Sequence, residues 1–129
     1  MNNLDKESIT GIAALLVHAA KIDEIYSEHE KSLVKDFIKS YLEHDDVDEI
    51  LKKAEEIEKN SNQLLNFTSI IKQNSMDVKK DILEHLWKVV ISDKTVDQYE
   101  SNLLRRICGL IYVPDKISAE IKMKLINSK

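Results

Sequence analysis

Apolar residues recur along this chain at the three- and four-residue spacings of an amphipathic α-helix, from near its start almost to its end. Ile9, Ile12, Ala13, Leu16 and Ala20, for example, fall on one helical face. Stripes of this kind predict helices over residues 9–20, 33–41, 47–57, 64–71, 78–90, 103–111 and 117–126. The pattern therefore predicts an all-α fold, a bundle of about seven helices.

The composition supports helices joined by polar loops within one domain, residues 1–129. The chain has only two glycines and one proline among its 129 residues. A β or α/β fold of this size would need more tight turns with positive φ, which glycine supplies most readily. Pro114 marks the end of the sixth predicted helix.

The first and fifth predicted helices resemble each other, and so do the second and sixth. A shift of 70 residues aligns the apolar residues and the acids of both segments. The aligned pairs are Ile12 with Ile82, Leu16 with Leu86, Asp23 with Asp93, Glu30 with Glu100, and Leu33 with Leu103. The matched acids in the loops favour an internal duplication of a helical hairpin over chance similarity of two amphipathic hairpins.

Charge and cysteine content narrow the class of protein. The net charge of −4 disfavours a nucleic-acid partner, and no apolar run approaches the roughly 20 residues of a membrane span. The single cysteine, Cys108, excludes an internal disulfide, so a reducing cytoplasm is the expected location. Cys108 and Trp87 lie in apolar helical segments and are predicted to be buried.

The charges are unevenly distributed along the chain. Residues 43–59 hold eight acids against three lysines, and residues 105–129 hold six basic residues against two acids. This asymmetry is compatible with two solvated faces of opposite sign, and also with a surface that attracts a protein partner.

The acids in the two matched loops have a structural interpretation. Ser27 followed by Glu30, and Asp97 followed by Glu100, both have the spacing of a capping box. In a capping box the side chain of the first residue accepts a hydrogen bond from the backbone N–H of the glutamate. The glutamate side chain in return accepts a hydrogen bond from the backbone N–H of the first residue.

The same loops are also candidates for a divalent-cation site. Asp23 and Glu30 in the first loop, with Asp93 and Glu100 in the second, would supply four carboxylates if the loops lie close together. Ca²⁺ takes six to eight oxygen ligands, so one loop alone offers too few for tight binding. The EF-hand spacing is missing, and we expect at most weak binding of Ca²⁺ or a similar ion.

The segment LWKVVISDKTVDQYESNLLRRICGLIYVPD, residues 86–115, resembles the C-terminal signature of the tellurite-resistance TerB-like family. The segment IDEIYSEHEKSLV, residues 22–34, resembles that family's other copy of the motif. The resemblance implies an all-helical cytoplasmic protein linked to tellurite resistance or stress. TerB-like domains also occur fused to a membrane-anchored DnaJ-type co-chaperone.

The resemblance also implies metal ligands at Asp23, Glu30, Asp93 and Glu100. The family's glycine after the aspartate is replaced here by Glu24 in the first loop and by Lys94 in the second. Glu24 adds a possible ligand, whereas Lys94 places a cation beside Asp93 and would weaken metal binding there.

The sequence contains no glycine-rich phosphate loop and no recognisable pairing of a nucleophile with a base, which argues against an enzyme. It predicts a non-enzymatic stress-response protein, a metal-responsive binding or scaffold module with an unidentified protein partner. The alternative is a protein–protein interaction domain in which the acidic loop residues only cap helices. The oligomeric state is left open.

Overall fold

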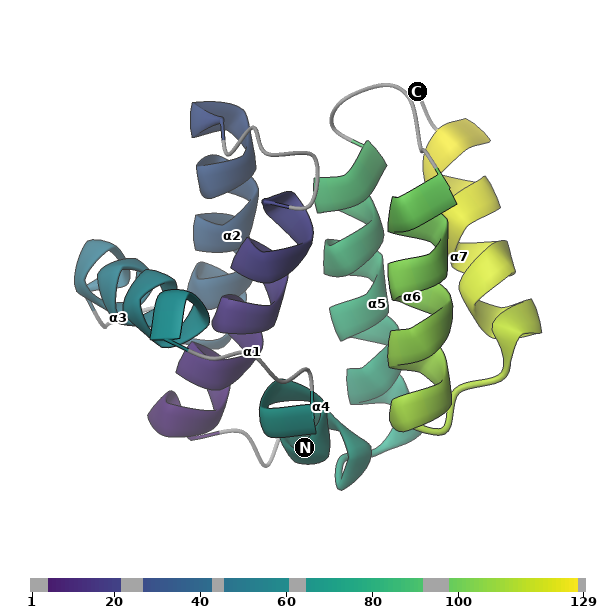
Figure 1. The fold of residues 1–129 in the computed structure, drawn as a ribbon, viewed down its shortest axis with the longest axis horizontal. Helices are drawn as coiled ribbons and strands as arrows, with labels where there is room; N and C mark the ends of the chain where they lie inside the picture. The colour runs from purple at the N-terminus through teal and green to yellow at the C-terminus, as the bar shows by residue number, and fades with distance from the viewer. Residues whose placement is uncertain (1–4, 22–26, 43–45, 61–64, 92–97, 128–129) are drawn as a thin grey trace.

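The computed structural model describes residues 5–21, 27–42, 46–60, 65–91 and 98–127, and these residues form seven α-helices with no strand among them (Figure 1). The helices are α1 (Lys6–Ala20), α2 (Glu28–Tyr41), α3 (Val47–Asn60), α4 (Leu65–Lys72), α5 (Met76–Ile91), α6 (Gln98–Leu110) and α7 (Asp115–Asn127). The predicted all-α class and the seven predicted helices are confirmed. Leu64, predicted to start the fourth helix, lies outside the described residues.

α1 is the central helix of the bundle, and it is apolar on nearly every side. Its buried residues run almost without interruption from Ile9 to Ala20. It packs against α2, α3, α4 and α5, so each face of the helix has a neighbour to cover it. A helix that is apolar all round is expected at such a position, because no face remains for solvent.

The two segments related by the 70-residue shift adopt corresponding structures. Shifted by 70 residues, α1 would span 76–90 and α2 would span 98–111, which match α5 and α6 to within one residue at each end. Buried residues also correspond, as at Ile12 and Ile82, or Leu16 and Leu86. The structure therefore supports the predicted duplication.

The correspondence extends to the third helix of each set. α3 packs mainly on α1 and also on α2, and α7 packs mainly on α5 and also on α6. The molecule thus has two halves, α1–α3 on the left of Figure 1 and α5–α7 on the right. α4 lies between the halves and contacts α1, α5 and α6.

Buried polar groups in the second half are paired. The Trp87 indole N–H on α5 donates to the Ser118 hydroxyl on α7 over 2.9 Å, inside the core. Cys108 on α6 is fully buried, and burial raises the pKa of its thiol, although a hydrogen bond with Ser118 opposes the shift. The predicted burial of Trp87 and Cys108 is confirmed, and Ser118 joins three helices at this point.

The two helical glycines differ in what surrounds them, which gives a test of the packing. A Cβ at Gly109 would meet no atom within 4 Å, and glycine costs a helix about 0.5–1 kcal/mol relative to alanine. We expect Gly109→Ala to raise the free energy of unfolding by about 0.5 kcal/mol, because the residue lies close to the end of α6. Urea unfolding measures the change.

Gly11→Ala is the matched control. A Cβ at Gly11 would lie 3.0 Å from Cδ1 of Ile70 on α4, so the propensity gain is offset by a displaced side chain. We expect Gly11→Ala to be less stable than Gly109→Ala. The opposite order would contradict the close approach of α1 and α4.

Candidate functional site

The start of α2 carries the capping box that the sequence predicts. The Ser27 hydroxyl oxygen accepts from the backbone N–H of Glu30 over 3.1 Å. In return, Oε1 of Glu30 accepts from the Ser27 backbone N–H over 2.9 Å and lies 3.1 Å from the Ser27 hydroxyl. Ser27 has extended backbone angles, as an N-cap residue requires.

The Glu30 carboxylate is an unusual feature of this helix start, because it is only 1% exposed. A buried carboxylate is costly unless hydrogen bonds or opposite charges compensate for the lost water. Ser27 supplies two of those hydrogen bonds, and the positive end of the α2 dipole favours a negative charge in the first turn. Glu30 is therefore fixed in place at the point where the first acidic loop joins α2.

The other predicted site residues cannot be placed relative to Glu30. Asp23, Glu24 and Asp93 lie outside the described residues. Glu100 lies in α6, where its backbone is described and its side chain is not. Because α6 begins at Gln98, Glu100 is the third residue of the helix, the position that the predicted capping box assigns to it.

The helix ends next to the two loops lie on one side of the molecule. In Figure 1 α1 and α5 both end, and α2 and α6 both begin, toward the upper edge. The helices that carry the two acidic loops thus share one edge of the bundle. Within the described ranges, no group of three or more His, Cys, Asp or Glu side chains is arranged to hold a metal ion.

A partly exposed ion-pair cluster lies at the end of α1, beside the first loop. Glu58 on α3 accepts from Nζ of Lys21 over 2.9 Å and lies 3.2 Å from Nδ1 of His18. Burial alone would raise the pKa of Glu58, but the hydrogen bonds from Lys21 and His18 outweigh burial and lower the pKa. This cluster was not predictable from the sequence, because Glu58 lies 37 to 40 residues beyond its two partners.

Two surface depressions border these helices. One, of about 420 Å³, has both lysines and glutamates along its walls: Lys21, Lys31, Lys52, Glu55, Glu56 and Lys59. Charges of both signs at solvated helix ends are ordinary, and they do not select a ligand.

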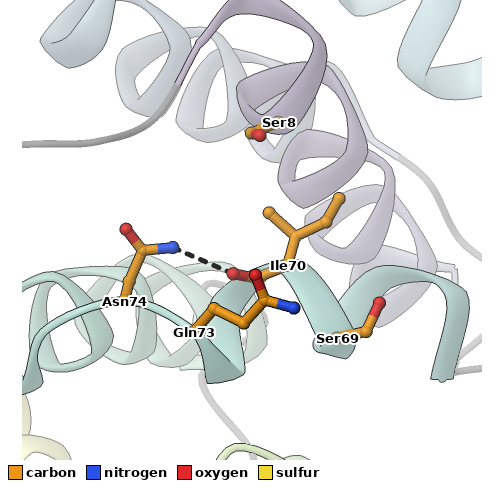
Figure 2. Close-up of a pocket in the computed structure, with 5 residues that line it drawn as sticks. All are labelled: Ser8, Ser69, Ile70, Gln73 and Asn74. Atoms are coloured by element: carbon orange, nitrogen blue, oxygen red, sulfur yellow. Dashed lines mark hydrogen bonds between the residues drawn. The ribbon is translucent and has the colours of Figure 1, made fainter.

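The second depression, of about 350 Å³, lies between the start of α1 and the end of α4 (Figure 2). Ser8, Ser69, Ile70, Gln73 and Asn74 line it, and the Asn74 amide donates to the Ile70 carbonyl over 2.9 Å. These lining side chains carry no charge, so this pocket offers neither an acid–base pair nor ligands for a cation.

Comparison with known families agrees with this fold and with the two motif copies. The family model described as "Tellurite resistance protein TerB" matches residues 10–123. The match begins in α1 and ends in α7, so it includes both halves of the bundle. The chain belongs to the TerB family. No curated protein and no solved structure matches it.

Membership of the TerB family confirms the family that residues 22–34 and 86–115 resemble, and it places the chain in a family related to tellurite resistance. Over the described residues, no helix is both long and apolar enough to cross a bilayer. The TerB fold here brings Glu30 to the buried start of α2, next to a loop that carries two further acids, Asp23 and Glu24.

The capping box gives a direct test of the helix start. Ser27→Ala removes the acceptor for the Glu30 N–H, and loss of an N-cap side chain costs about 1 kcal/mol. We expect that loss in urea unfolding, whereas Ser27→Thr should retain most of the stability, because threonine can accept from the Glu30 N–H and keeps a hydroxyl donor for the buried Glu30 carboxylate. Equal stability of Ser27→Ala and the native chain would contradict the cap.

Proposed function

We propose that this TerB-family chain is a non-enzymatic module in which a divalent cation orders the two acidic loops and thereby changes a surface that binds a partner protein. The proposed ligands are Asp23, Glu24 and Glu30 in the first loop, with Asp93 and Glu100 in the second. The observation that carries the proposal is Glu30, a buried carboxylate fixed where the first loop meets α2.

The shared edge of the bundle also supports this proposal. The described ends of α1 and α5 and the described starts of α2 and α6 lie on one side in Figure 1. Six to eight oxygens suit Ca²⁺, and two loops supply them more readily than one. Lys94 next to Asp93 makes the second loop the weaker contributor, so modest affinity is expected.

The absence of catalysis is part of the same proposal. Cys108, the single thiol of the chain, is fully buried and burial raises its pKa, which disfavours the nucleophilic thiolate. A lone buried cysteine also suits the reducing cytoplasm, where we propose that the module acts in a stress or tellurite response.

A second candidate is an interaction domain whose acidic loop residues only cap helices. The complete capping box at Ser27 and Glu30 favours it, because Oε1 of Glu30 is already engaged by Ser27. α7 adds an exposed apolar surface, with Met123 53% and Ile126 41% exposed one turn apart. Such residues on an outer helix suit a protein partner.

Thermal unfolding in chelator, and then with Ca²⁺, Mg²⁺, Mn²⁺ or Zn²⁺, tests the cation. A ligand that binds only the folded chain stabilises it by about 2.7 kcal/mol at 100 times its Kd. For a domain of this size we expect one ion to raise the unfolding midpoint by several degrees. Asp23→Ala/Asp93→Ala should abolish that rise while the chain still folds.

Glu30→Gln separates the two candidates, because glutamine also serves in a capping box but is a poorer cation ligand. We expect Glu30→Gln to keep the stability measured in chelator and to lose most of the increase in unfolding midpoint that the ion causes. Glu28→Gln, an exposed position in the same turn, is the control and should keep the rise. No rise with any ion at millimolar concentration would instead favour the interaction domain.

A further inference from the structure

A cluster of three titratable side chains joins the two halves of the molecule. The Tyr41 hydroxyl, at the end of α2, donates to Oδ2 of Asp81 on α5 over 2.6 Å. His85 lies one turn further along α5, with Nε2 3.8 Å from the other oxygen of the same carboxylate. Asp81 therefore lies between a tyrosine of the first half and a histidine of the second.

The imidazole of His85 packs against the ring of Phe37. The Phe37 ring lies 5.2 Å from it, edge to face, and also 5.2 Å from the Tyr41 ring. Phe37 is fully buried, and the His85 side chain is only 12% exposed. An imidazole in these surroundings packs as a neutral ring, because a charged one would lose most of its hydration.

We propose that Tyr41, Asp81 and His85 form a proton-operated latch between α2 and α5, closed while His85 is neutral and released when the imidazole takes up a proton. The distances supply the mechanism. At 3.8 Å the Asp81 oxygen is too far for a hydrogen bond to His85. An imidazolium would draw that carboxylate closer by about 1 Å, to the distance of a charge-assisted hydrogen bond. This movement draws Asp81 away from the Tyr41 hydroxyl.

The charges around His85 set the pH range of the latch. Burial lowers the pKa of His85, and Lys88 adds to the effect. Three carboxylates act in the opposite direction: Asp81 and Glu84 on α5, and Asp36 on α2. On the α2 side, burial and then the bond to Asp81 raise the pKa of Tyr41, so its hydroxyl stays protonated and remains the donor.

The lowered pKa gives the direction of the pH effect. In the unfolded chain His85 has its ordinary pKa of about 6.5, and in the folded chain its pKa is lower. The unfolded chain therefore takes up the proton first as the pH falls. The stability that neutral His85 contributes is therefore complete above that pH. It is lost as the pH falls below about 6.5, and α2 should then loosen from α5.

An NMR titration of the His85 ring protons in the full chain, carried out in chelator, tests the latch independently of any cation. In the native chain we expect a His85 pKa below the ordinary value. In Tyr41→Phe the carboxylate loses its phenol donor and becomes available to the imidazolium, so the pKa of His85 should rise by about half a unit or more. A tyrosine with only a packing role would leave that pKa unchanged.

Amide exchange at pH 7.5 and 5.5, corrected for the intrinsic rate, measures the release of α2. Protection in the last turns of α2 should fall several-fold at the lower pH in the native chain. It should fall equally in His29→Gln, which changes an exposed histidine on the same helix, and not in His85→Gln. A native His85 pKa at or above its ordinary value would overturn the latch. So would a pKa that Tyr41→Phe leaves unchanged, or a full pH response in His85→Gln.

Discussion

The burial of α1 is the constraint on which the rest of the fold depends. This helix has no polar face to give to solvent along most of its length, so four other helices must cover it. Gly11 permits one of these approaches, because a Cβ at that position would lie only 3.0 Å from Cδ1 of Ile70 on α4. The ends of α1 are then fixed by polar contacts, with Asp5 capping its start and Lys21 paired to Glu58 just beyond its end.

The duplicated helices show how one sequence pattern serves two positions in the bundle. α5 repeats the register of α1, and it carries polar groups where it meets α2 and α7. Trp87 donates to Ser118 on α7, and Asp81 accepts from Tyr41 on α2. In each case a polar side chain at the boundary of the apolar stripe has its partner on a different helix. For the buried Trp87 this bond satisfies an N–H that burial would otherwise penalise.

Helix number and register were predictable because each depends on local periodicity. The stripe at Leu103, Leu104 and Ile107 and the aligned stripe at Leu33 and Val34 determine which faces are buried. The capping box at Ser27 and Glu30 was equally predictable, since its two residues are three positions apart. The Tyr41–Asp81 bond was not, because it depends on how α2 rotates against α5, and sequence spacing carries no information on that angle. The cation ligands stay a prediction for the same reason, since they require two distant loops to meet.

The contacts at the two ends of α2 connect the proposed cation site with the proposed latch. Apart from Glu30, only Val34, Phe37 and Ile38 of this helix are buried, so apolar packing holds its middle and polar contacts hold its ends. Glu30 fixes the start of the helix beside the first acidic loop, and Tyr41 fixes its end on α5. A ligand shifts a conformational equilibrium only as far as its affinities for the two states differ. The proposed cation would favour one position of α2, and a proton on His85 would favour a different position of the same helix. Binding of the cation would then change the affinity of His85 for its proton, and protonation would change the affinity for the cation.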